Sequence, residues 1–305
     1  MSRNWKGNLM LLLTAFIWGS AFVAQSTGMN YIGPFTFLAI RSFLGVIALL
    51  PVIAFRASKQ EKTVRQQNSR VKITWTGGFF CGIILGVASA FQQVGLGMTS
   101  AGKAGFITAL YIVIVPIVSV FIGKKIHLST WFYLLIALVG FYLLSVKEGF
   151  SIGKGDLLVL CCAFCYSIHI LTIDYFLNKG ADPVKMSCMQ FLISGILGLI
   201  LTLLFETPSL ASIWDAKIPL LYAGVLSSGV AYTLQIVGQK YTEPTIATLL
   251  MSLESVFAAL TGWIVLHEVL SGKELLGCLL VFLAVILAQI PFPIKRKITD
   301  EEENC

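Results

Sequence analysis

The strongest constraint on this chain is its division into apolar runs of about twenty residues, separated by short charged tracts. A helix rises about 1.5 Å per residue, so about 20 apolar residues cross the roughly 30 Å hydrocarbon core of a bilayer. Helices also satisfy their own backbone groups, which lipid cannot do. The pattern therefore predicts an all-α integral membrane protein with ten spans, at residues 8–26, 33–55, 73–96, 102–122, 130–146, 156–178, 184–205, 218–238, 244–266 and 273–292.

The composition agrees with this prediction: 57% of the residues are hydrophobic and 12% are charged, against roughly 45–50% and 25% in soluble proteins. Most lysines and arginines fall on one side of the predicted topology, including the basic inner loop at 56–72. By the positive-inside rule we expect a protein of the cytoplasmic membrane with both termini in the cytoplasm, including the tail at 293–305. The net charge of +7 then reflects orientation and contact with anionic lipid, so the bilayer, and no nucleic acid, is the expected partner.

Two stretches of the first half of the chain resemble stretches of the second half. TAFIWGSAF at 14–22 resembles CAFCYSIHI at 162–170. FITALYIV at 106–113 falls on LLMSLESV at 249–256. The chain is therefore predicted to contain an internal repeat.

The repeat predicts the architecture, because each half holds five spans and five is an odd number. The halves at 1–146 and 147–292 must then enter the membrane from opposite sides. Inverted repeats of this kind hold their substrates near the membrane midplane, between the halves. The second alignment also places Tyr111 opposite Glu254.

Several motifs in the two halves resemble those of a known family. They are AFIWGSAF in the first span, Pro34 seven residues before Arg41 in the second, FITALYIVIVPIVSVFIGKK in the fourth, and SLESVFAALTGWIVLHEVLSGKELLG across the last two. In this order they resemble the EamA family of the drug/metabolite transporter superfamily, over roughly residues 8–290.

The resemblance implies a ten-helix carrier with spans 1, 3, 4, 6, 8 and 9 around a central cavity and spans 5 and 10 at the periphery. Members move amino acids and other small metabolites, generally without ATP. The chain departs from the family at Leu253, Glu254 and Ser255, where Leu-Glu-Pro is usual. The proline that kinks the ninth span is therefore missing.

Glu254 lies near the midplane of the ninth span, where an ionised carboxylate costs roughly 2.5–3.5 kcal/mol on the mildest insertion scale. A residue kept at such a cost usually faces a wet cavity or a partner. We interpret Glu254 as a substrate-binding and proton-coupling group. A structural carboxyl that is hydrogen-bonded across a helix interface is the alternative.

Arg41 lies in the second span, about 10 Å from its outer end. It could hold a substrate carboxylate with both arms of its guanidinium, or anchor helix ends by reaching the outer interface. Because the resemblance puts span 2 outside the cavity, we assign it a structural role. Gln190 follows Pro183 as Arg41 follows Pro34, and it receives the same structural assignment.

His169, one turn after Tyr166 in span 6, is a second candidate for substrate contact and proton coupling, because histidine titrates near physiological pH. A hydrogen-bonded core histidine is the alternative. Aromatic side chains in the expected cavity helices are candidates for stacking on a substrate, although each could equally pack in the core. They are Trp18, Phe91, Tyr111, Tyr166 and Tyr232.

Gln92, Gln93 and Gln235 place amides in spans 3 and 8. In a membrane such amides bond to a neighbouring helix, or to cavity water and substrate, so they join the candidate substrate contacts. Pro116 removes one hydrogen bond from span 4 and is the candidate hinge.

The function that these features favour is secondary transport of a small organic metabolite, such as an amino acid or related zwitterion, by alternating access with proton coupling. An integral-membrane enzyme is an alternative. The sequence contains no HExxH, and its one GxSxG match, at residues 149–153, falls in the short loop between two predicted spans, so we assign no catalytic or metal-binding residues and no cofactor. A non-transporting sensor or scaffold is a third reading. Assembly as a homodimer is compatible with all three.

Overall fold

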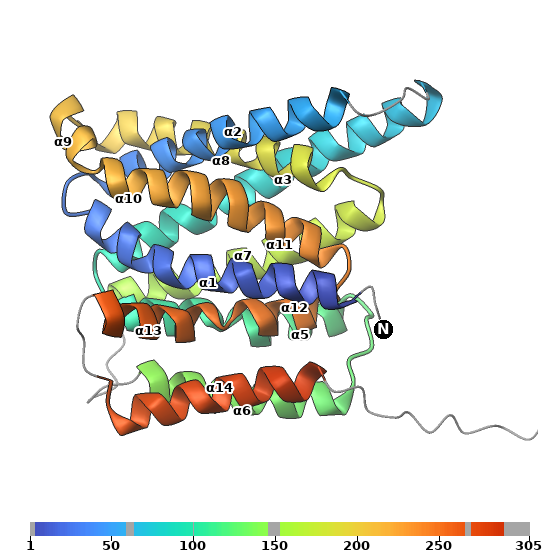
Figure 1. Ribbon diagram of the computed structural model, residues 1–305, viewed down its shortest axis with the longest axis vertical. Coiled ribbons are helices and arrows are strands. Elements are labelled where there is room, and N and C mark those ends of the chain that lie inside the picture. The colour runs from blue at the N-terminus through green and yellow to red at the C-terminus, as the bar shows by residue number, and fades with distance from the viewer. Residues whose placement is uncertain (1–3, 59–63, 100, 146–152, 266–269, 290–305) are drawn as a thin grey trace, which may run out of the picture.

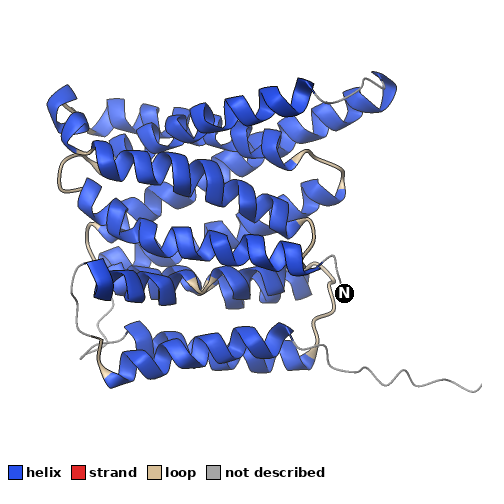
Figure 2. Cartoon of the chain, viewed as in Figure 1, coloured by secondary structure: helices blue, strands red, loops and turns tan. Residues whose placement is uncertain are grey.

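The computed structural model describes residues 4–58, 64–99, 101–145, 153–265 and 270–289. Within these ranges all regular structure is helical (Figure 2). The first half contains α1 (Asn4–Gly28), α2 (Pro34–Ser58), α3 (Val64–Leu96), α4 (Ala101–Ala109), α5 (Tyr111–Phe121) and α6 (Leu128–Ser145). The second contains α7 (Lys154–Asn178), α8 (Pro183–Phe205), α9 (Leu210–Asp215), α10 (Lys217–Leu221), the π-helix η1 (Tyr222–Ala231), α11 (Tyr232–Gln239), α12 (Pro244–Met251), α13 (Glu254–Val265) and α14 (Gly272–Gln289).

Eight helical segments of the described residues are long and apolar enough to cross a membrane, and α6 adds a shorter apolar stretch at Leu128–Leu144. The helix α14 covers the tenth predicted span and packs lengthwise against α6 (Figure 1). The predicted all-α membrane architecture is confirmed, and the chain is a multi-pass membrane protein.

The inner loop predicted at 56–72 is shorter than expected. Helix α2 continues to Ser58 and α3 begins at Val64, while residues 59–63 lie outside the described part. Arginine, glutamine and lysine form helices readily in water, so the polar stretch VRQQNSRVK extends α3 beyond the apolar run instead of forming a loop.

The packing of the helices has the symmetry that the predicted repeat requires. Each contact between two spans should recur between their counterparts in the other half. The contact of α3 with α7 corresponds to that of α11 with α1. The contact of α3 with α8 corresponds to that of η1 with α2. The contact of α1 with α13 becomes that of α7 with α4 and α5, and the pairs α2–α8 and α6–α14 are unchanged. All of these contacts occur in the structure.

Helices α2 and α8 run antiparallel at one edge of the bundle, beside α3 (Figure 1), and they join the two halves at both of their ends. Where α2 begins, the Glu206 carboxylate after α8 accepts hydrogen bonds from the backbone N–H groups of Phe35 and Thr36, both at 2.8 Å. A carboxylate at a helix N-terminus is favourable because it meets unpaired N–H groups and the positive end of the helix dipole.

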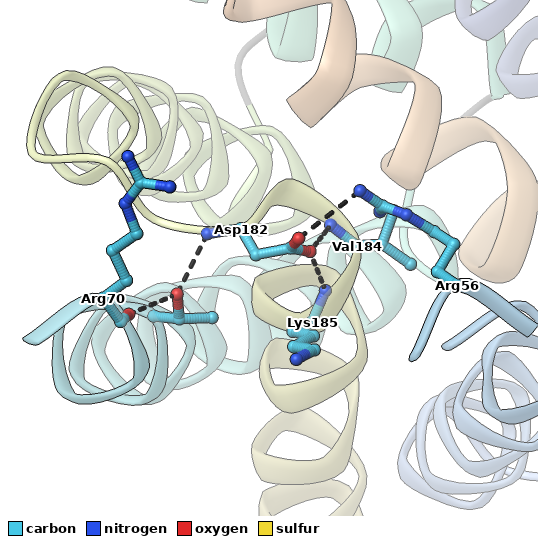
Figure 3. A network of polar contacts seen from close by, with 6 residues as sticks. Arg56, Arg70, Asp182, Val184 and Lys185 are labelled. Carbon is cyan, nitrogen blue, oxygen red and sulfur yellow. Dashed lines mark hydrogen bonds and ion pairs between the residues drawn. The ribbon is translucent and has the colours of Figure 1, made fainter. Parts of the chain in front are cut away.

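At the opposite face, Asp182 caps α8 and pairs with α2 (Figure 3). Its carboxylate accepts from the N–H groups of Val184 and Lys185 at 3.0 Å and lies 3.4 Å from the Arg56 guanidinium. The backbone N–H of Asp182 donates to the Thr74 hydroxyl of α3 at 2.9 Å. One aspartate therefore fixes the start of α8 against α2 and α3.

Candidate functional site

The fourth and ninth spans are each interrupted near their middle. In the fourth, α4 ends at Ala109 and α5 begins at Tyr111; in the ninth, α12 ends at Met251 and α13 begins at Glu254. The repeat alignment places Tyr111 and Glu254 at the same position, so both interruptions fall at equivalent points of the two halves.

The same backbone hydrogen bonds form at both interruptions. Leu110 N–H donates to the Ile107 carbonyl at 3.2 Å, and its counterpart Leu253 donates to Leu250 at 3.3 Å. One turn later, the carbonyls of Leu110 and Leu253 each accept a regular helical bond, at 3.1 and 2.9 Å. Each break is thus one tightened turn, and discontinuous helices of this kind line the sites of many transporters.

The interruption of the ninth span occurs without the proline that the family usually has. Ser255 occupies the proline position, yet the helix is broken at Ser252 and Leu253. The Ser252 hydroxyl donates to the Leu249 carbonyl at 2.8 Å, so a side chain satisfies a backbone acceptor beside the break. In the fourth span the break precedes Pro116 by six residues, and Pro116 lies inside α5.

A buried cavity lies beside the two interruptions. It offers about 40 Å³ to water-sized molecules, and one water needs about 10–15 Å³, so in this conformation it holds only a few waters. Its lining comes from spans 1, 2, 3, 4, 6, 8 and 9: Trp18, Phe22, Gln25, Arg41, Gln92, Thr108, Tyr111, Tyr166, His169, Ile170, Ser227, Tyr232, Gln235, Met251 and Glu254.

The predicted pair of Tyr111 and Glu254 meets inside this cavity. The Tyr111 hydroxyl donates to Glu254 Oε1 at 3.1 Å, and both side chains are buried. Because one comes from the fourth span and the other from the ninth, this hydrogen bond joins the two halves at the level of the two interruptions.

A chain of neutral polar groups forms another part of the lining. Tyr232 donates to the Tyr166 hydroxyl at 3.2 Å, and Tyr166 donates to Gln92 Oε1 at 3.3 Å. The Trp18 ring packs on Tyr232, with ring centroids 4.5 Å apart. Trp18 and Tyr166 occupy equivalent positions of the repeat, so both halves contribute an aromatic side chain to the cavity.

His169 lines the cavity and is completely buried. Its Nε2 lies 3.0 Å from Gln190 Oε1. An amide oxygen can only accept, so Nε2 donates in this hydrogen bond. Gln190 itself is not among the lining residues, and its side chain holds the His169 ring from behind.

Arg41 is placed differently from the expectation that span 2 stands outside the cavity. Its side chain lines the cavity and is 4% exposed. Its Nη1 donates to Gln25 Oε1 at 3.3 Å. The cause is the packing of α2 against η1, where a Cβ on Gly224 would lie 3.1 Å from the Arg41 carbonyl oxygen.

Two predicted contacts lie outside the cavity lining, and one important residue was missed. Phe91 packs against the hydrophobic core, and Gln93 is buried, with both amide atoms unpaired among the described residues. Gln25 was not predicted because it stands at the end of an apolar run. It follows Trp18 by seven residues, which is two helical turns, and this spacing on one face could have identified it.

The sequence pattern of the EamA-like transporter family matches the chain twice, over residues 5–146 and 153–289. An uncharacterized transporter from Archaeoglobus fulgidus is 32% identical over 93% of this chain and 85% of its own length. An S-adenosylmethionine/S-adenosylhomocysteine transporter from Chlamydia muridarum is 23% identical and covers 90% of each chain. A solved protein structure superposes with a TM-score of 0.76 at 18% identity, over 93% of this chain and 96% of that one, so the fold is shared. With both halves matched by one pattern, this chain belongs to the EamA-like transporter family.

Proposed function

We propose that this protein is a secondary transporter that moves a small zwitterionic metabolite, such as an amino acid, across the cytoplasmic membrane by alternating access. The observation that supports this most strongly is the cavity between the halves, with Tyr111 and Glu254 meeting at the interruptions of the fourth and ninth spans. The relatives with printed functions are transporters, and one is named for a metabolite.

The charges of the lining favour a zwitterion. Apart from His169, Arg41 is the single base and Glu254 the single acid among the residues that line the cavity. Aromatic rings and amides make up most of the remaining surface, and these bind small organic molecules well. A diphosphate would require more buried cations than one arginine.

The contacts at the two membrane faces support alternating access. Where α7 begins, Lys103 and Asp156 form an ion pair of 2.5 Å with side chains 24% and 5% exposed. At the face where α7 ends, Lys124 pairs with Asp174 at 2.7 Å, with exposures of 44% and 15%. Exposed ion pairs contribute only about 0–1 kcal/mol, so the face where α7 ends is the easier one to open.

Glu254 is the proposed proton-coupling group, with His169 as a second one. A buried carboxylate without a cation among its described hydrogen-bond partners is most stable either protonated or paired with a cationic substrate group. Proton binding would then release the substrate amine, and substrate binding would release the proton. Transport would accordingly depend on the pH difference across the membrane.

Counterflow of labelled solutes into proteoliposomes tests the proposal, with protein-free liposomes as the control. Glu254→Gln removes the carboxylate that pairs with the substrate amine, so it should weaken solute binding, and the exchange that remains at raised solute concentration should no longer respond to a pH gradient. Glu243→Gln is the matched control, because Glu243 lies at the exposed start of the same span. Failure of the wild-type protein to exchange any metabolite would refute the transporter, whereas an unchanged pH response in Glu254→Gln would refute only the coupling.

A further inference from the structure

Arg41 is a buried cation that no acidic side chain of the described residues neutralises. A guanidinium stays protonated in proteins, and this one is 4% exposed. The ion pairs of the described residues join Arg56 to Asp182, Lys103 to Asp156 and Lys124 to Asp174, and none of them includes Arg41.

The hydrogen bonds of Arg41 are also incomplete. Its Nη1 makes a long bond of 3.3 Å to Gln25 Oε1, and its buried Nε has no acceptor in the described part of the chain. A buried charge that lacks a partner costs several kcal/mol. The cost is offset if an anion binds at this point of the cavity.

The repeat shows that the fold does not need a charge at this position. Gln190 occupies the position of Arg41 in the other half, and it bonds to His169 of the adjacent span at 3.0 Å. Arg41 likewise bonds to Gln25 of its adjacent span. An uncharged amide therefore suffices to join the two helices in one half, so the charge in the other half serves a different purpose.

The opposite charge of the cavity comes from the other half of the molecule. Glu254 begins α13 and is hydrogen-bonded to Tyr111, not to Arg41. The neutral groups Tyr166, Tyr232 and Gln92 line the same cavity. The two charges thus remain available for the two ends of one small molecule.

We propose that Arg41, oriented by Gln25, binds the carboxylate of the transported solute and selects for carboxylate-bearing molecules. The inference rests on the proposed transport function and adds the group that determines specificity. The planar fork of a guanidinium matches a carboxylate with two parallel hydrogen bonds, and a bound carboxylate oxygen gives the unpaired Nε an acceptor. Because Arg41 lies about 10 Å from the start of α2, the carboxylate end of the solute lies toward that face.

Matched pairs of ligands test this assignment. The purified wild-type protein and Arg41→Gln are titrated with the proteinogenic amino acids and with the carboxamide of each, and binding is followed by thermal stabilisation and by competition in counterflow. A hydrogen-bonded charge is worth about 1.5–3 kcal/mol, so the wild type should prefer acid over amide by about ten- to a hundredfold. In Arg41→Gln this preference should fall below about threefold.

The structural alternative predicts a different result. If Arg41 only joins helices, Arg41→Gln weakens the binding of each amino acid and of its carboxamide by the same factor. This outcome overturns the inference. Arg41→Lys keeps the positive charge but loses the planar guanidinium, so it should retain an intermediate preference for the acid over the carboxamide.

The wild-type comparison alone decides the matter if Arg41→Gln does not fold: equal binding of acid and amide, or no binding of any carboxylate, overturns the carboxylate site. If only solutes without a carboxylate show counterflow, the proposed transport function is supported and the carboxylate site at Arg41 is refuted. If no solute shows counterflow, both the transport function and the carboxylate site are refuted.

Discussion

Helices α3 and α8 cross at Gly82 with their backbones almost in contact, and substituting alanine there should disturb both stability and the cavity. A Cβ on Gly82 would lie 2.8 Å from the Gln190 carbonyl oxygen and 2.6 Å from the Ile193 Cβ. Ordinary contact begins at 3.4 Å, so the two helices must separate by about 0.6–0.8 Å. A backbone atom cannot move out of the way as a flexible side chain can.

The expected cost of Gly82→Ala follows from three effects. Overpacking costs about 1–3 kcal/mol, and the better helix propensity of alanine returns up to about 1 kcal/mol. Moving the Gln190 backbone also stretches the 3.0 Å bond to His169, which is worth about 0.5–1.5 kcal/mol. We expect a net loss of about 2 kcal/mol, a lower unfolding temperature in detergent, and reduced transport.

Gly86→Ala is the matched control on the same ridge of α3. Its closest contact would be Leu197 Cδ2 at 2.7 Å, the end of a flexible side chain, and the nearest backbone atom is 3.4 Å away. This variant should remain within about 1 kcal/mol of the wild type. Equal unfolding temperatures for the Gly82 and Gly86 variants would refute the steric reasoning.

The remaining predictions concern the peripheral helix pair and the Glu254 contact. Gly277→Ala would place its Cβ 2.6 Å from a backbone carbonyl oxygen of α6, whereas a Cβ on Gly272 meets nothing within 4 Å. We therefore expect Gly277→Ala to lower the unfolding temperature and Gly272→Ala not to, with little change in transport per folded molecule because α6 and α14 do not line the cavity; equal stabilities would contradict this. Tyr111→Phe removes the donor to Glu254 and should change the pH dependence of counterflow, whereas Tyr31→Phe, at an exposed site, should not; identical pH profiles for the three proteins would exclude Tyr111 from coupling.

The helices and their repeat could be predicted from the sequence because the bilayer allows few alternatives. An apolar run of about twenty residues has to be a helix in lipid, and alignment of the halves brought Tyr111 and Glu254 to equivalent positions before any contact was known. Their hydrogen bond at 3.1 Å shows how closely the halves approach there.

Two features of the site depend on packing that no local pattern reveals. The break at Leu253 forms without a proline, and the Ser252 hydroxyl satisfies a backbone carbonyl beside it. Arg41 reaches the cavity because α2 lies directly against the π-helix η1, and a π-helix has no strong sequence signal. Gln25 could have been placed on the cavity face of its helix by its seven-residue spacing from Trp18, but its contact with Arg41 depends on the placement of α2.

The interruptions at Leu110 and Leu253 have a consequence for motion. No proline ring occupies either joint, so each leucine keeps an N–H that can exchange a carbonyl three residues back for one four residues back. Such an exchange passes through the loss of one hydrogen bond, worth about 0.5–1.5 kcal/mol, and it would turn the second segment of the span about its own axis. Tyr111 and Glu254 are the first residues beyond these joints, so rewinding either joint would swing one of them away from the other. If the proposed solute binds between these two side chains, its binding would be linked to the winding of the helices at the same two points of the chain.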